Sequence, residues 1–158
     1  MDKNFIYHSS HRKIQYPEIV IGKNSKDFSN GFYCTRIKEQ AEKEASKFVN
    51  PIVNVYSLED ISHLKVKVFK EYNSEWLNFV VHCRNGNTHD YDIVESFKCD
   101  DTILDSLDEY INDYIDKEKF LEMMKYNWRD RQISIHTVKA LDCIKFIECY
   151  DMEAEEIK

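Results

Sequence analysis

Seven short runs of β-branched and aromatic residues, spaced along the whole chain, are the feature that most restricts the fold. They lie at residues 5–8, 31–35, 52–57, 64–69, 91–94, 133–136 and 145–150, and their composition is typical of β-strands. Several are separated by fewer than the dozen or so residues that a parallel crossover needs. The pattern lacks a regular βαβ rhythm, so it predicts an α+β domain with a mostly antiparallel or split sheet.

Apolar residues at helical spacing occupy the longer intervals between these runs. They predict helices near residues 37–48, 76–81, 103–115, 120–124 and 138–141. Thr35 is expected to cap the first of these helices and Thr137 the last. The strict alternation over residues 64–68 predicts one buried and one wet face, and lysine on the wet face suits an edge strand.

Composition narrows the class of protein. A length of 158 residues predicts a single domain, 1–158, with an acidic tail from about residue 152. The 22 basic and 29 acidic residues give a net charge of −7, which argues against generic nucleic-acid binding. No apolar run approaches the roughly 18 residues of a membrane helix, and the N-terminus does not resemble a secretory signal. Five cysteines without a C-x-x-C pair predict reduced thiols in a cytoplasmic protein, and no metal site.

The common catalytic motifs are absent from the chain, including the P-loop, G-x-G-x-x-G, H-E-x-x-H and G-x-S-x-G. Three short segments remain as candidates for a site. They are Tyr7-His8-Ser9-Ser10, then Lys26-Asp27-Phe28-Ser29-Asn30-Gly31-Phe32-Tyr33-Cys34-Thr35, and finally Arg131-Gln132-Ile133-Ser134-Ile135-His136-Thr137. Taken singly, each has an ordinary explanation: a hydrogen-bonding histidine, a core tyrosine and a polar residue at a strand edge.

Taken in order, these segments resemble the His–Tyr–Glu triad of the diphtheria-toxin-like and poly-ADP-ribosyl ADP-ribosyltransferases. The sequence is also similar to a bacterial family of small ADP-ribosyltransferase-like proteins, formerly a domain of unknown function. The further motifs that match this family in order are Val53-Asn54-Val55-Tyr56, Trp76-Leu77-Asn78-Phe79-Val80 and Tyr91-Asp92-Ile93-Val94. The resemblance extends from about Tyr7 to Tyr150.

The resemblance implies an ADP-ribosyltransferase-like split β-sheet with flanking helices. It also implies that the protein binds NAD and transfers ADP-ribose to a protein or nucleic-acid acceptor, releasing nicotinamide. Because elongation in the superfamily relies on glutamate, glutamine at the third position implies mono-ADP-ribosyl transfer. A toxin- or defence-linked role follows by resemblance, with a small helical antitoxin as a partner.

The resemblance assigns His8, Tyr33 and Gln132 as catalytic residues, and His8, Ser9, Ser10, Gly31 and Tyr33 as residues that bind NAD. By this resemblance, His8 would bind a ribose hydroxyl on the adenosine side, and the main chain of Ser9 would hold the nicotinamide amide, with Ser10 close by. Tyr33 would stack on the nicotinamide ring, and Gln132 would meet the nicotinamide ribose.

Several positions depart from the pattern of the family. Ser9 and Ser29 stand where glycine is expected, and Ser96-Phe97 stands where Gly-Pro is expected. Glycine serves where a backbone approaches a ligand closely. These changes favour, as an alternative, a catalytically weakened NAD- or protein-binding module of the same fold, or a plain interaction protein without a cofactor.

Other side chains are weaker candidates. Arg12 and Arg84 could pair with pyrophosphate oxygens, although exposed arginines are common. His136 is expected to cap or support Thr137. The loop that selects the acceptor in the superfamily would lie near residues 127–131.

Overall fold

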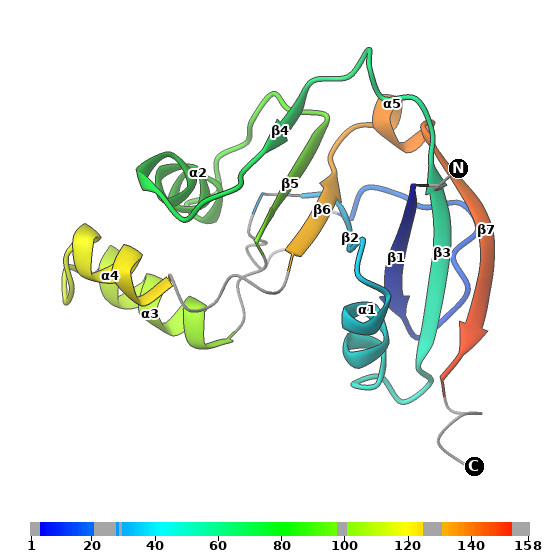
Figure 1. Ribbon diagram of the computed structural model, residues 1–158, viewed down its shortest axis with the longest axis horizontal. Coiled ribbons are helices and arrows are strands. Elements are labelled where there is room, and N and C mark those ends of the chain that lie inside the picture. The colour runs from blue at the N-terminus through cyan, green and yellow to red at the C-terminus, as the bar shows by residue number, and fades with distance from the viewer. Residues whose placement is uncertain (1–3, 21–27, 29, 98–100, 125–130, 153–158) are drawn as a thin grey trace.

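Two separate β-sheets form the centre of the protein (Figure 1). The computed structural model describes residues 4–20, 28, 30–97, 101–124 and 131–152. The first sheet has the order β1-β3-β7, and the second has the order β2-β6-β5-β4. The strands are β1 (Phe5–Ser10), β2 (Phe32–Cys34), β3 (Ile52–Leu58), β4 (Val66–Val68), β5 (Ile93–Phe97), β6 (Arg131–Ile135) and β7 (Ile144–Asp151). Strands β4 and β5 run parallel, and the other pairs within the two sheets are antiparallel. The predicted α+β class and the mostly antiparallel pairing are confirmed.

The sheets meet through one hydrophobic cluster. Successive residues of a strand point to opposite faces, so alternate positions of β2, β5 and β6 face the first sheet. The buried side chains that fill this space include Ile6, Tyr56 and Leu58 from the first sheet and Phe32, Ile93, Ile133 and Ile135 from the second. This layer carries β1 alongside β2 and so positions the candidate site.

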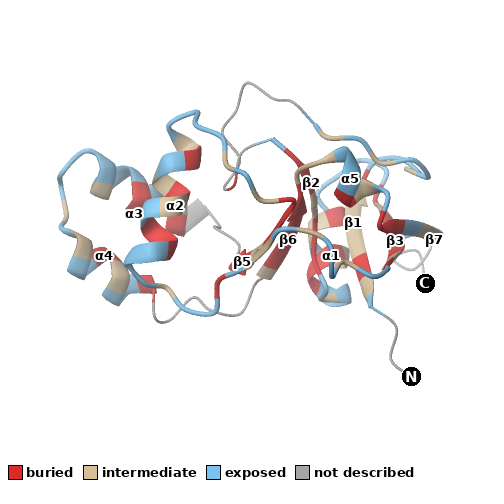
Figure 2. Cartoon of the chain, turned by 90° about the horizontal axis from the view of Figure 1, so that it is seen from above, coloured by how far each residue is buried: buried red, intermediate tan, exposed pale blue. Residues whose placement is uncertain are grey.

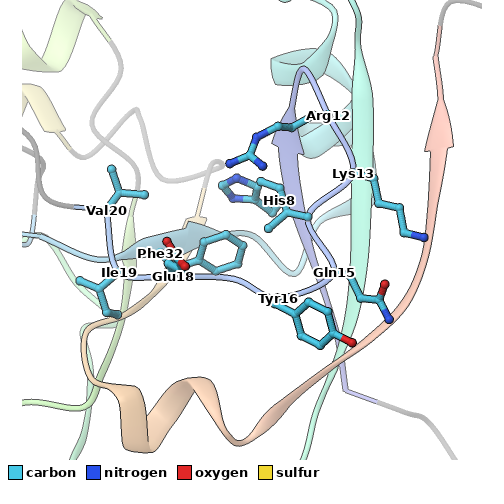
Figure 3. A pocket seen from close by; sticks show the side chains of 10 residues that line it. His8, Arg12, Lys13, Gln15, Tyr16, Glu18, Ile19, Val20 and Phe32 are labelled. Carbon is cyan, nitrogen blue, oxygen red and sulfur yellow. The ribbon is translucent and has the colours of Figure 1, made fainter.

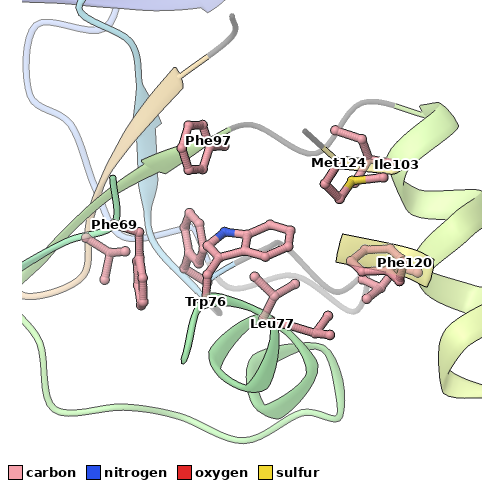
Figure 4. Packing of buried hydrophobic residues seen from close by; sticks show 11 residues of the cluster. Phe69, Trp76, Leu77, Phe97, Ile103, Phe120 and Met124 are labelled. Carbon is pink, nitrogen blue, oxygen red and sulfur yellow. The ribbon is translucent and has the colours of Figure 1, made fainter. Parts of the chain in front are cut away.

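Helices cover the outer face of each sheet. Helix α1 (Lys38–Ala45) packs Ala41 and Ala45 against Val53 and Val55 of β3. Helices α2 (Ser74–Arg84), α3 (Asp101–Ile111) and α4 (Lys117–Met124) cover the second sheet through a larger cluster around Trp76, whose ring stacks on Phe120 with centroids 6.3 Å apart (Figure 4). Figure 2 shows buried residues along β5 and β6 and on turns of α2 and α3.

The ends of the helices confirm some predictions and overturn others. Thr137 caps α5 (Val138–Leu141), because its hydroxyl accepts a hydrogen bond from the N–H of Ala140 at 3.2 Å. Thr35 is not the N-cap of α1. The cap position is Ile37, which has no side-chain acceptor, while the Thr35 hydroxyl accepts from the N–H of Ile37 at 3.1 Å. Helix α3 ends at Ile111, earlier than predicted, and Asp113 follows with a positive φ of 63° that cannot continue a helix.

Strand β4 lies at the edge of the second sheet, as its lysines predict. The predicted alternation of burial is wrong, because Val68 is 41% exposed and Lys67 is partly buried, with Lys67 forming an ion pair to Glu75 at 3.0 Å. An edge strand this short has little covering it on either face. The predicted acidic tail beyond residue 152, Ser29 and residues 127–130 lie outside the described residues.

The segment that follows β1 crosses the first sheet and is tied down by a buried asparagine. The amide oxygen of Asn54 accepts from the N–H of Ile14 at 2.8 Å, and its amide nitrogen donates to the carbonyl of Arg12 at 3.1 Å. Asn54 is fully buried, and a buried amide is stabilising when its donors and acceptors are satisfied. The Tyr56 hydroxyl adds a bond to the Ile14 carbonyl at 2.6 Å.

We expect Asn54→Ala to lower the free energy of unfolding by about 2 kcal/mol, because it removes two hydrogen bonds and leaves a cavity. Urea denaturation measures this. Asn50→Ala is the matched control: Asn50 also donates to a carbonyl of this segment, that of His11 at 3.0 Å, but at an exposed position. Its effect should stay within about 0.5 kcal/mol. Equal effects of the two substitutions would contradict the role assigned to Asn54.

Candidate functional site

The first and second sheets are linked where β1 runs beside β2. The N–H of Tyr7 donates to the carbonyl of Thr35 at 2.8 Å, and the N–H of Thr35 donates to the carbonyl of Tyr7 at 2.9 Å. An antiparallel ladder that continued from this pair would next join Ser9 to Tyr33. Within the described chain the pairing stops at the single bridge between Tyr7 and Thr35.

The imidazole of His8 takes the place of that next pair. Its Nδ1 lies 2.6 Å from the carbonyl oxygen of Tyr33, which is the acceptor that the N–H of Ser9 would otherwise use. Because a carbonyl oxygen only accepts, Nδ1 carries the proton and a neutral His8 has an acceptor at Nε2. The ring also stacks on Phe32, with centroids 4.2 Å apart. His8 therefore holds β1 and β2 apart directly beyond the point where they join.

The main chain of Ser9 lies on the open edge of β1 that results. The main-chain N–H and C=O of Tyr7 point toward β2. Those of Ser9, two residues further along the strand, point to the same side, whereas the main chain of His8 faces β3. The Ser9 hydroxyl donates to the carbonyl of Ala41 in α1 at 2.5 Å. Its side chain thus turns toward the helix, and the serine in the position of an expected glycine leaves this edge open.

Tyr33 and Gln132 share one face of the second sheet. Tyr33 is paired with Ser134 in the β2–β6 ladder, and Gln132 is two residues from Ser134 along β6, so the three side chains point the same way. This is the face that α2, α3 and α4 cover. Tyr33 packs beside the cluster around Trp76, and its hydroxyl accepts from the N–H of Phe28 at 3.0 Å.

The predicted catalytic residues are therefore arranged around the split between β1 and β2 in two groups. His8 lies with Phe32 on the side of β2 that faces the first sheet, whereas the phenol of Tyr33 and the buried Gln132 lie on the other side. The contact between the groups runs through the Tyr33 main chain. Ser10 is buried, and its hydroxyl accepts from the N–H of Arg12 at 3.4 Å, so it supports the segment after β1.

Helix α1 fixes the start of β6 beside Gln132. The Gln40 side chain donates to the carbonyl of Arg131 at 2.9 Å and accepts from its N–H at 3.1 Å, as a neighbouring strand would. The guanidinium of Arg131 bonds the carbonyl of Phe69 at 3.0 Å and lies 4.9 Å from the centre of the Phe97 ring. These contacts hold the main chain from which Gln132 projects.

Two histidines hold the residues that lead into β2. His89 Nε2 lies 2.9 Å from the carbonyl of Phe28, and His136 Nδ1 lies 2.8 Å from the carbonyl of Asn30. The rings are in edge-to-face contact at 4.3 Å. His136 Nε2 lies 2.7 Å from the Ser134 hydroxyl. His136 was expected to act on Thr137. Its ring instead bonds to the carbonyl of Asn30, which precedes β2, and to the hydroxyl of Ser134.

Close packing explains the glycine at position 31. A Cβ atom there would lie 2.8 Å from the carbonyl oxygen of Ile135 and 2.9 Å from His136 Nδ1. Both distances are shorter than real Cβ contacts, so any side chain would push β2 away from β6 and break the contact of His136 with Asn30. The geometry gives Gly31 a packing role, and the predicted contact with NAD stays a prediction.

Most of the chain matches one sequence family. Residues 5–146 match the family described as "Protein of unknown function (DUF3990)". The chain belongs to this family. Neither the curated proteins nor the solved structures gave a match.

The DUF3990 chain also has a pocket of about 680 Å³ beside the split, lined by His8, Phe32 and residues of the segment after β1, among them Arg12 (Figure 3). Within the described ranges, no three His, Cys, Asp or Glu side chains are placed to hold a metal ion, and no helix could cross a membrane.

Asn54, His89 and Gln40 build the surroundings of the site, although no such role was predicted for them from the sequence. One signal for Asn54 was available: an amide side chain interrupts the apolar strand sequence Val53-Asn54-Val55, and a polar residue at such a position needs buried partners. Gln40 and His89 carry no comparable local signal, because their partners are more than sixty residues away in sequence.

We expect His8→Ala to slow hydrogen exchange at the Ser9 amide by tenfold or more, because the N–H of Ser9 can then bond to the vacated Tyr33 carbonyl. NMR-detected exchange measures this. His8→Gln retains a side-chain donor and should leave the exchange of Ser9 fast. The Tyr7 amide, which bonds to Thr35, should be protected in all three proteins. A Ser9 amide that exchanges alike in wild type and His8→Ala would contradict the separating role of His8.

The stability of the fold should fall in mild acid because of His136. Burial lowers the pKa of His136 from 6.5 to about 4, and the nearby His89 adds to this. Between about pH 6.5 and 4, the unfolded chain takes up a proton that the folded chain excludes, so the free energy of unfolding decreases by up to about 3 kcal/mol. Urea denaturation at several pH values should show a smaller decrease in His136→Gln. The exposed His11→Gln should keep the full decrease, and equal profiles for the two variants would exclude His136 as the cause.

Proposed function

We propose that this protein is an NAD-dependent mono-ADP-ribosyltransferase, and that its two sheets form the split sheet of that superfamily. The observation that supports this most directly is the open edge of β1 at Ser9, which lies between His8 and the strand that carries Tyr33. A main-chain N–H and C=O side by side match a primary carboxamide, which presents one acceptor and one donor group. The nicotinamide of NAD carries such a group.

NAD would cross the split between β1 and β2. The ribose of its adenosine half would donate a hydroxyl to Nε2 of His8, the nitrogen that becomes the acceptor once Nδ1 bonds to Tyr33. The pocket of about 680 Å³ beside His8 is within the roughly 300–1,000 Å³ of small-molecule sites. The nicotinamide would then lie toward Tyr33, which is only partly buried and whose flat ring suits stacking.

In the proposed reaction, the bond between nicotinamide and ribose C1′ breaks, and its electron pair leaves with the neutral nicotinamide. The ribose carries the positive charge until the acceptor forms a bond to C1′ and loses a proton. The carbonyl dipole of Gln132 would stabilise this charge. A neutral amide does so less strongly than a carboxylate, because charge-assisted hydrogen bonds are about twice as strong. Glutamine at this position is in keeping with transfer of single ADP-ribose units.

The proposal includes a protein or nucleic acid as acceptor and, in a toxin-linked role, a small helical antitoxin as partner. The neutral Gln132 and the serine at position 9 also favour a second candidate: a binding module that retains NAD recognition without turnover. The two candidates differ in whether nicotinamide is released.

We expect the purified protein to release nicotinamide from NAD, and Tyr33→Ala and Gln132→Ala each to reduce the rate by a hundredfold or more, the size of loss typical when a transition-state contact is removed. Chromatographic detection of nicotinamide measures this, with circular dichroism confirming the fold. Tyr114→Ala, at a tyrosine that is 80% exposed, is the matched control and should retain the wild-type rate.

Two results would reject the enzymatic proposal. If the wild type releases no nicotinamide but NAD raises its melting temperature, the binding module is the correct function, because a ligand of the native state raises stability. If Tyr33→Ala releases nicotinamide at the wild-type rate, the site assignment is wrong.

A further inference from the structure

Arg12 stands at the pocket beside the split, and no carboxylate of the described residues pairs with it. The pocket lies between residues 11–20 and the strands β1 and β2. In Figure 3 the guanidinium of Arg12 lies next to the imidazole of His8, above the ring of Phe32. Among the described ion pairs none involves Arg12.

The fold holds the main chain of Arg12 in place. Its carbonyl accepts from the amide of the buried Asn54 at 3.1 Å, and its N–H donates to the Ser10 hydroxyl at 3.4 Å. The Cα of Arg12 is thus tied to both β1 and β3. An arginine whose stem is anchored loses less freedom when its planar fork binds an anion, and phosphate oxygens fit that fork through two parallel hydrogen bonds.

The other charged residues of the pocket are arranged differently. Lys13 extends toward β7, where its ammonium group lies 5.3 Å from the centre of the Phe146 ring. Glu18 is the one carboxylate among the described residues that line the pocket, and in the same view it lies beside Phe32, whereas Arg12 lies beside His8. An anionic group is therefore favoured at the end of the pocket that Arg12 and His8 form.

We propose that Arg12 binds the diphosphate of a nucleotide ligand in this pocket. The identification of the complete ligand as NAD rests on the proposed function, whereas recognition of the diphosphate rests on Arg12 itself. With the diphosphate on the guanidinium, the adenosine ribose lies at the neighbouring His8. Arg12 thereby contributes affinity for the ADP half of the dinucleotide and takes no part in breaking the bond to nicotinamide.

The test compares ligands with and without phosphate by isothermal titration calorimetry, using adenosine, ADP and ADP-ribose with the full chain. Arg12→Ala should weaken the binding of ADP and ADP-ribose by about ten- to a hundredfold, the range expected for the loss of a hydrogen bond to a charged group. The affinity for adenosine should stay unchanged. Arg12→Lys should recover part of the affinity, since it keeps the charge without the fork. Lys13→Ala, the neighbouring cation, is the matched control and should bind all three ligands like wild type.

The outcomes separate this inference from the proposed function. If ADP-ribose binds and Arg12→Ala weakens it while wild type releases no nicotinamide, Arg12 keeps its role and the enzymatic proposal fails. If wild type turns over NAD and Arg12→Ala has the same KM, the role of Arg12 is rejected while the enzymatic proposal stands. The role of Arg12 would also be rejected if Arg12→Ala lost affinity equally for adenosine and ADP-ribose, or if the wild type failed to bind ADP and ADP-ribose.

Discussion

The hydrogen bond from the His8 imidazole to the Tyr33 carbonyl determines how the two sheets separate. Without it, the ladder begun by Tyr7 and Thr35 has the register to continue through Ser9. A side-chain donor at this position satisfies the carbonyl while leaving the next main-chain N–H and C=O on an open strand edge. The exposed edge and the adjoining pocket both depend on the His8 imidazole bonding to the Tyr33 carbonyl in place of the Ser9 N–H.

Polar side chains from distant parts of the chain keep the short strand β2 in place. His89 and His136 hold the residues before it, and the missing side chain of Gly31 lets β2 approach β6 closely. Both histidines act in the neutral form, because burial lowers the pKa of each. A three-residue strand has few ladder bonds of its own, so these contacts supply much of what fixes the Tyr33 main chain.

Local sequence signals succeeded where the deciding interaction is local. The Thr137 cap depends on a residue three positions away, and the edge position of β4 follows from its lysines. They failed where the tertiary environment decides: Val68 is exposed because little covers an edge strand of three residues, and α3 ends before its apolar pattern does. Thr35 bonds ahead of α1 because its main chain is already engaged with Tyr7.

The sequence by itself determined the α+β class, since several of its strands are too closely spaced for parallel crossovers. It also set the chemical nature of the candidate groups, including a neutral amide at Gln132. Only the tertiary structure decided that His8 bonds the Tyr33 main chain from one side of β2 while the phenol and Gln132 lie on the other, and that Arg12 stands beside His8. The physical reason is that these relations depend on the register between strands and on buried side chains such as Asn54. Their partners are remote along the chain, and no local pattern encodes them.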